Sequence, residues 1–217
     1  MTQVLINFDF PEKYSDALAE KYPELKFVRC PDRNEAFSYL QDTEILITFF
    51  QCTKEIIDAA PGLKWIQAIT AGVDYMPLDA IFERGIIVTN GRGIHRINMA
   101  EYAMAAMISL ARNFHLILWN QARRKWDTSP RQGEIYGATV GIVGLGEIGG
   151  AIAEKASVFG MRVIGVKRSP EPVDFVDEIY GPDEMAKVFE KSDYVINLLP
   201  FTTETHKVID AKFFNSP

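Results

Sequence analysis

The sequence feature that most constrains the fold is a glycine-rich turn made of Gly144, Leu145, Gly146, Glu147, Ile148 and Gly149. The apolar, β-branched run at 139–143 before it predicts a buried strand, and residues 150–156 after it predict a helix. In such a turn the first glycine permits a sharp bend, the second lets the backbone approach a pyrophosphate, and the third lets the helix pack closely on the strand. The free N–H groups at the start of the helix then favour an anion. This context predicts a dinucleotide-binding turn, and a glycine-rich turn without a ligand is the alternative.

The residues after the next predicted strand, at 161–166, indicate which dinucleotide is preferred. Folds that bind NAD often place an Asp or Glu roughly 20 residues past the glycines, where it accepts a hydrogen bond from the ribose 2′-hydroxyl. That position holds Lys167, Arg168 and Ser169 instead. Two cations and a hydroxyl suit a 2′-phosphate. The sequence therefore favours NADP over NAD, which is the second choice, and a solvated basic turn is the alternative.

Composition sets limits on the other classes of function. The chain has 217 residues, a net charge of −6 and a pI of about 5.2, and it contains no long basic block, which argues against nucleic-acid binding. Two cysteines form neither a metal spacing nor a disulfide framework, so we expect reduced thiols in a cytoplasmic protein. The segment 99–118 contains charged and polar residues, and we therefore expect a helix buried inside the protein or between domains rather than a membrane span.

Strands alternate with helices along the whole chain, which predicts right-handed βαβ units and parallel sheets. Five strands are expected between residues 4 and 89, with Thr53 as the N-cap of one helix between them. A long helix starts near Asn98. The second domain should contain strands at 139–143, 162–166, 179–180 and 194–199, and a helix at 183–191.

A short loop after the fourth predicted strand is a candidate anion site. It contains Ala71, Gly72 and Val73, and ligands of parallel sheets bind beyond the carboxyl ends of the strands. Successive N–H groups of such a loop can form a nest for a small carboxylate, and a plain connecting loop is the alternative. Phe49 and Phe50, after the third strand, are expected either to line the substrate pocket, where they would favour an apolar side chain, or to pack in the core.

Taken together, these segments resemble the D-isomer-specific 2-hydroxyacid dehydrogenases. The loop 70–74, the crossover from 88 to 112, the glycine turn and the segment 193–205 all match motifs of that family. The resemblance implies a flavodoxin-like substrate domain, 1–98, and a Rossmann cofactor domain, 99–217, each a doubly wound parallel sheet and the second incomplete at its C-terminal end. It also implies hydride transfer between a nicotinamide cofactor and a small 2-oxo acid, a homodimer built through the cofactor domains, and contacts to the nicotinamide and ribose from Leu199, Pro200 and Thr205.

The resemblance also concerns residues outside the chain. The family's catalytic Arg, Glu and His lie after the strand that would follow 212–214, so we expect a C-terminally truncated member and assign no catalytic residue and no metal ligand here. For His95 we expect a structural or solvated ring in preference to a direct role in binding the substrate. The alternative function is a non-catalytic dinucleotide-binding or sensing module on the same scaffold, while a methyltransferase explains Lys167 and Arg168 less well.

Overall fold

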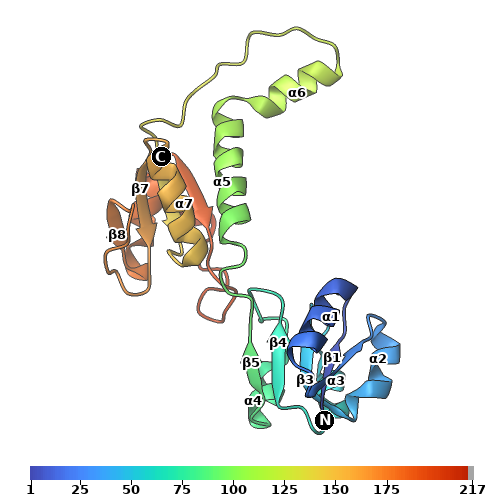
Figure 1. The fold of residues 1–217 in the computed structure, drawn as a ribbon. Helices are drawn as coiled ribbons and strands as arrows, with labels where there is room; N and C mark the ends of the chain where they lie inside the picture. The colour runs from blue at the N-terminus through green and yellow to red at the C-terminus, as the bar shows by residue number, and fades with distance from the viewer. Residues whose placement is uncertain (215–217) are drawn as a thin grey trace. The chain divides into compact units, whose positions relative to one another are not determined.

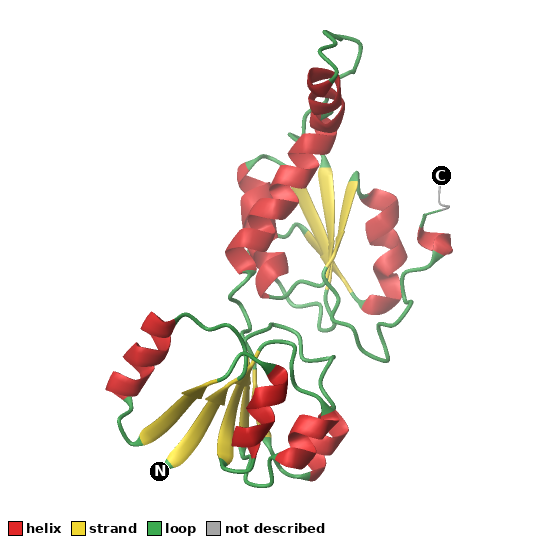
Figure 2. Cartoon of the chain, turned by 90° about the vertical axis from the view of Figure 1, so that its right-hand side faces the viewer, coloured by secondary structure: helices red, strands yellow, loops and turns green. Residues whose placement is uncertain are grey.

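The computed structural model describes residues 1–214, without the side chain of Lys212. The chain forms two compact units, Met1–Arg92 and a second that begins at Gly93. Each unit is a parallel β-sheet flanked by helices (Figures 1 and 2). The α/β class and the two parallel sheets expected from the sequence are confirmed. The predicted division fell between 98 and 99, and the last residues of the predicted second domain, 215–217, lie outside the described residues.

The first unit has five parallel strands in the order β2-β1-β3-β4-β5, which is the flavodoxin-like order that was expected. The strands are β1 (Thr2–Ile6), β2 (Leu25–Arg29), β3 (Thr43–Thr48), β4 (Trp65–Ala68) and β5 (Ile87–Thr89). The helices are α1 (Glu12–Lys21), α2 (Arg33–Leu40), α3 (Lys54–Ala59) and α4 (Leu78–Glu83). One core between sheet and helices contains Leu5, Leu46, Ile56, Ile57, Ile66 and Ile81, all fully or almost fully buried.

Local hydrogen bonds explain where two of these helices begin. The Asp32 carboxylate accepts from the backbone N–H groups of Asn34 and Glu35, at 2.8 and 2.9 Å, and so caps α2. Thr53 occupies the position before α3, as predicted, but its side chain makes no capping bond and instead accepts from Arg33 at 3.2 Å. Thr53 is thus the N-cap of α3 by position and extended backbone conformation, as predicted, although its side chain makes no capping bond.

The second unit has four parallel strands in the order β8-β7-β6-β9, which corresponds to the 3-2-1-4 part of a Rossmann sheet. The strands are β6 (Thr139–Val143), β7 (Arg162–Val166), β8 (Glu178–Tyr180) and β9 (Tyr194–Asn197). The helices are α5 (Arg96–Ala111), α6 (Phe114–Ala122), α7 (Glu147–Val158) and α8 (Met185–Lys191), with short 3₁₀ turns η1 (Pro182–Glu184) and η2 (Ala211–Phe213). Glycine at 141 brings α8 close to the sheet, because a Cβ there would lie 2.6 Å from Val188 Cγ1 and 2.4 Å from Ser192 Oγ.

The long helix expected over 99–118 is two helices in the structure. Asn113 lies between them in the left-handed conformation, with φ of 54°, and its side-chain amide donates to the carbonyl of Arg131. Asn tolerates this conformation better than most residues, which is why the break occurs here. α5 buries Ala100 and Met104 among its inward residues, whereas α6 buries none. The expected burial of the whole segment is therefore wrong for α6, which lies away from the sheet (Figure 1).

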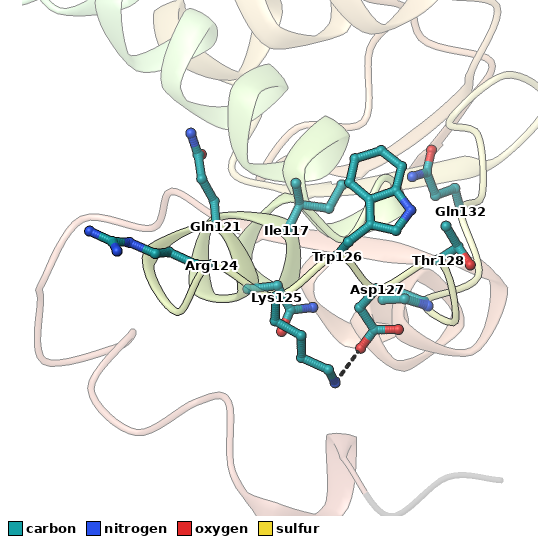
Figure 3. Close-up of a pocket in the computed structure, with 10 residues that line it drawn as sticks. Ile117, Gln121, Arg124, Lys125, Trp126, Asp127, Thr128 and Gln132 are labelled. Carbon is teal, nitrogen blue, oxygen red and sulfur yellow. Dashed lines mark hydrogen bonds and ion pairs between the residues drawn. The ribbon is translucent and has the colours of Figure 1, made fainter.

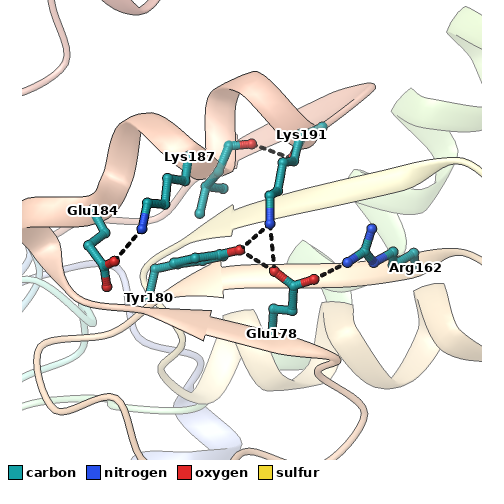
Figure 4. Close-up of polar contacts among 8 residues, drawn as sticks. Arg162, Glu178, Tyr180, Glu184, Lys187 and Lys191 are labelled. Atoms are coloured by element: carbon teal, nitrogen blue, oxygen red, sulfur yellow. Dashed lines mark hydrogen bonds and ion pairs between the residues drawn. The ribbon is translucent and has the colours of Figure 1, made fainter.

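A network of charged side chains ties the edge strand β8 to its neighbours (Figure 4). The Glu178 carboxylate accepts hydrogen bonds from Tyr180, from Lys191 at 3.0 Å and from Arg162 on β7. The Tyr180 hydroxyl, and then Lys191 and Arg162, hold the pKa of Glu178 at about 2, well below the ordinary glutamate value. Charged side chains on an edge strand also discourage pairing with another sheet.

Candidate functional site

The glycine turn joins β6 to α7 and each of its glycines has a distinct geometry. Gly144 has φ of 109°, a conformation that side chains disfavour. A Cβ on Gly149 would lie 2.5 Å from the carbonyl oxygen of Gly144, so α7 packs directly against the turn. A Cβ on Gly146 would meet no atom of the described residues within 4 Å, and Gly146 is the N-cap of α7. The turn is thus bent by the first glycine, closed by the third, and left open at the second.

The other residues of the turn divide between the core and the surface. Leu145 is 7% exposed and fills the space beside Gly165, where a Cβ would lie 2.7 Å from its Cδ1. Ile148 packs partly against the core, and Glu147 is exposed. Only the backbone of Leu145 is therefore available to a ligand, since its side chain belongs to the sheet packing.

Two further predicted segments lie on either side of this turn, because β7 and β9 are the neighbours of β6. Lys167, Arg168 and Ser169 directly follow β7, with Arg168 and Ser169 exposed. The Thr202 hydroxyl and, more weakly, the charge of Arg168 lower the pKa of Glu204, which places the basic segment near the loop after β9. The carboxyl edge of the sheet thus brings all three predicted cofactor segments together.

The loop after β9 encloses a small pocket of about 180 Å³. Leu199, Pro200 and Thr205, all predicted site residues, line it together with His206. The Thr205 hydroxyl donates to the carbonyl of Pro200, and Leu199 N–H donates to the side chain of Asn197 at 3.1 Å. These bonds fix the loop in a bent conformation beside the glycine turn, since Leu198 N–H donates to the carbonyl of Val143 at 2.8 Å.

The candidate anion loop of the first unit, 69–75, is held by its own hydrogen bonds. Thr70 donates to the carbonyl of Gly72 at 2.7 Å and therefore accepts from the Tyr75 hydroxyl at 3.0 Å. The amide of Asn90 donates to the carbonyl of Ala71 at 2.6 Å. Gly72 is exposed while Ala71 and Val73 are half-buried. The carbonyls of Thr70, Ala71, Gly72 and Val73 thus accept hydrogen bonds within the unit.

Buried polar groups at the ends of β1 and β3 were not identified from the sequence. Four side-chain atoms are buried and have no hydrogen-bond partner among the described residues: Asn7 Nδ2, Asn7 Oδ1, Thr48 Oγ1 and Gln51 Oε1. Ile6 pairs with Ile47, so Asn7 and Thr48 lie side by side at the carboxyl edge. This is the switch point of a 2-1-3-4-5 sheet, where ligands bind. In the sequence, these residues could have been noticed as polar residues that directly follow the apolar runs 4–6 and 45–47.

Thr48→Val is expected to stabilise the protein by about 1 kcal/mol, because valine keeps the shape and removes a buried hydroxyl that has no partner. Thr43→Val, at the other end of the same strand, is the matched control. Thr43 is also fully buried, but its hydroxyl donates to the carbonyl of Tyr39 at 2.8 Å, so its loss should destabilise by about 1–2 kcal/mol. The midpoint of thermal unfolding should shift by about 2–4 °C per kcal/mol, upwards for Thr48→Val and downwards for Thr43→Val. Destabilisation by both substitutions would contradict the assignment of Thr48.

A larger pocket, of about 640 Å³, lies at the end of α6 and in the loop that follows (Figure 3). Ile117, Arg124 and Trp126 line it, and Lys125 forms an ion pair with Asp127 at 2.7 Å. Trp126 is 93% exposed. No predicted site residue lines this pocket, which separates it from the cofactor segments.

The histidines do not form a cluster with other ligand side chains. His95 precedes α5, His115 lies in α6 and His206 follows β9, and all three are exposed. Among residues 1–214, no group of three or more His, Cys, Asp or Glu side chains is placed to hold a metal ion. None of the helices in this part of the chain is both long and apolar enough to cross a bilayer.

Comparison with known proteins identifies the chain. Residues 104–216 match the D-isomer specific 2-hydroxyacid dehydrogenase NAD binding domain. D-3-phosphoglycerate dehydrogenase of Methanocaldococcus jannaschii is 30% identical over 198 residues, 88% of this chain and 37% of the relative. Glyoxylate reductase of Korarchaeum cryptofilum is 29% identical over 223 residues, 95% of this chain and 65% of the relative.

The solved structures agree with these relatives. A D-isomer specific 2-hydroxyacid dehydrogenase family protein from Aeromonas salmonicida superposes with a TM-score of 0.85 at 32% identity, over 94% of this chain and 66% of that one. The chain spans between about one third and two thirds of the length of these proteins. The glycine turn and the sheet order agree with these matches, and the chain therefore belongs to the D-isomer-specific 2-hydroxyacid dehydrogenase family.

Proposed function

We propose that the protein transfers a hydride between a nicotinamide cofactor, NADPH in preference to NADH, and a small 2-oxo acid or its 2-hydroxy product. The observation that carries this proposal is the open glycine turn with a basic segment beside it. Gly146 leaves space where a Cβ would otherwise stand, and Lys167 and Arg168 follow the neighbouring strand. The residues present therefore suit a dinucleotide with a 2′-phosphate.

Each cofactor segment has a separate part in this proposal. The backbone from Gly144 to Gly149 holds the pyrophosphate at the start of α7. Lys167, Arg168 and Ser169 hold the 2′-phosphate, and Leu199, Pro200 and Thr205 border the ribose and nicotinamide. When bound, the nicotinamide supplies or accepts the hydride.

The substrate is assigned to the carboxyl edge of the first sheet. The N–H groups of Ala71, Gly72 and Val73 bind its carboxylate, and Phe50 contacts the rest of the molecule. Two observations support this assignment: the loop carbonyls are bonded within the unit, and the loop surface at Gly72 is exposed. No residue of the chain is assigned as the general acid.

Oxidation of NADPH by the full-length protein, followed by absorbance over a panel of 2-oxo acids, tests the proposal. The relative named glyoxylate reductase suggests glyoxylate as one member of that panel. Turnover with NADPH faster than with NADH is the expected result. Tight NADPH binding without turnover of any 2-oxo acid would favour the alternative, a non-catalytic dinucleotide-binding or sensing module.

We further propose a homodimer through the second unit, in the cytoplasm, where Cys30 and Cys52 stay as free thiols. Support for the dimer comes from α6, whose apolar side chains are exposed, Leu118 at 60% and Trp119 at 58%. A patch of this kind on a folded protein marks an interaction surface. Leu118→Asp should convert the dimer to a monomer in analytical ultracentrifugation with little change in thermal stability, because α6 buries no residue in its own chain. Phe82→Asp, on the first unit, is the control and should leave the dimer intact.

A further inference from the structure

Six aromatic rings form a continuous row on the first unit. The rings belong to Tyr14, Phe10, Phe8, Phe49, Phe50 and Tyr75, in that order, with successive centroids between 4.5 and 6.2 Å apart. They come from the segment after β1, the first turn of α1, and the loops after β3 and β4. Since β1, β3 and β4 are adjacent in the sheet, the row follows the carboxyl ends of the strands.

The row is partly exposed and its rings are tilted. Phe50 is 60% exposed, Tyr14 51% and Phe49 45%. The angles between neighbouring ring planes run from 41° to 63°, so no pair is stacked in parallel. Aromatic groups prefer edge-to-face or offset contacts, and tilted rings leave faces and edges free for one more ring.

Phe50 is held in an unfavourable conformation to take its place in the row. Its φ is 56°, in the left-handed region that a bulky side chain rarely adopts. Backbone strain of this kind persists where the surroundings hold it, and it is concentrated at binding sites. Phe50 is held by its two neighbours in the row: its ring centroid lies 4.5 Å from that of Phe49 and 5.0 Å from that of Tyr75.

One end of the row is bonded to the candidate carboxylate loop. The Tyr75 hydroxyl donates to Thr70, and Thr70 donates to the carbonyl of Gly72. A ligand whose carboxylate lies on the loop would therefore have its other end next to Tyr75 and Phe50. The Tyr75 hydroxyl lies 3.0 Å from the Thr70 hydroxyl, and the centroids of the Tyr75 and Phe50 rings are 5.0 Å apart.

We infer that the row of aromatic rings binds an aromatic side chain of the substrate, so that the protein acts on aryl-substituted 2-oxo acids in preference to glyoxylate. This inference rests on the proposed function, because it uses the same carboxylate loop. Glyoxylate has no side chain and leaves the row uncovered, whereas a phenyl group covers it. Phe50 and Phe49 contact the aryl ring of the substrate, and Phe8 and Phe10 support them from the β1 side.

Steady-state kinetics of the full-length protein with phenylpyruvate and glyoxylate test the inference. Phe50→Gly removes the ring and also relieves the strained backbone, since glycine adopts a positive φ freely. This variant should lower kcat/KM for phenylpyruvate by about tenfold or more and that for glyoxylate by less than about twofold. Phe49→Leu is a second variant that keeps an apolar side chain. It should also lower kcat/KM for phenylpyruvate more than kcat/KM for glyoxylate.

Phe82→Ala is the matched control, because Phe82 is 62% exposed on the same unit but lies in α4, outside the row. It should leave both rates unchanged. The inference would be overturned, while the proposed function stands, if Phe50→Gly lowered kcat/KM equally for the two substrates. A wild-type protein that prefers glyoxylate would overturn it in the same way.

Direct binding separates the two proposals if no 2-oxo acid is turned over. Calorimetric titration of phenylpyruvate into the full-length protein should then show binding that Phe50→Gly weakens and Phe82→Ala does not. That result would retain the aromatic site although the proposed reaction had failed. Absence of binding by the wild type, or binding unaffected by Phe50→Gly, would overturn the inference as well.

Discussion

Gly149→Ala should destabilise the second unit by about 2 kcal/mol and weaken dinucleotide binding at the same time. The added Cβ would lie 2.5 Å from the carbonyl oxygen of Gly144, which is a backbone atom and cannot rotate away. Relief requires α7 to move from β6, and that movement opens the turn on which the pyrophosphate is proposed to bind. Chemical denaturation and NADPH titration of the same sample measure the two effects together.

The next residue of the helix provides the control. A Cβ on Gly150 would meet no atom within 4 Å, and this residue lies inside α7. Gly150→Ala should therefore stabilise the protein by about 0.5–1 kcal/mol, because alanine is the better helix former. Two neighbouring glycines thus have opposite expected signs. Stabilisation by both alanines would show that the close contact at Gly149 relaxes without cost.

Replacement of Lys167 and Arg168 together by alanine should weaken NADPH binding by about 100-fold, which corresponds to roughly 3 kcal/mol. Charge-assisted bonds to a phosphate dianion account for a loss of this size. NADH lacks the 2′-phosphate, so its affinity should change by less than about threefold. Fluorescence titration with each cofactor gives both values.

Lys187→Ala is the control for this double variant. Lys187 is a cation of the same unit, but it pairs with Glu184 at 2.6 Å beside β8. It should leave both affinities unchanged. If the double variant weakened NADPH binding and NADH binding equally, the two cations would contact a part of the cofactor that both molecules share. If it weakened the binding of neither cofactor, the two residues would form a solvated turn.

The parts of the fold that could be predicted from sequence are those set by local pattern. Apolar runs of four to six residues between turn signals located the strands, and the glycine spacing located the turn between β6 and α7. The two sheet orders followed from the alternation of strands and helices together with the family resemblance. Such features depend on residues close together in the chain, or on motifs that many proteins share.

The features that escaped prediction depend on contacts distant in sequence. The break at Asn113 is accompanied by a hydrogen bond to Arg131, and the hydroxyl of the N-cap residue Thr53 accepts from an arginine of α2. The unpartnered hydroxyl of Thr48 becomes visible only when β1 lies beside β3. For the same reason Phe50 could be named as a substrate contact, but the row that continues from it to Phe8 could not.

The salt-bridge network around Glu178 has a consequence for handling the protein in acid. Because the pKa of this carboxylate in the folded protein is about 2, its contribution to stability is complete above the ordinary glutamate value near 4.5. That contribution is lost progressively as the pH falls from there towards 2. Protonation would remove the ion pairs of Glu178 with Arg162 and Lys191, while β8 would still pair with β7 through its backbone. Thermal unfolding followed as the pH is lowered from about 4.5 towards 2 should therefore show a loss of stability, and Glu178→Gln should make that loss smaller.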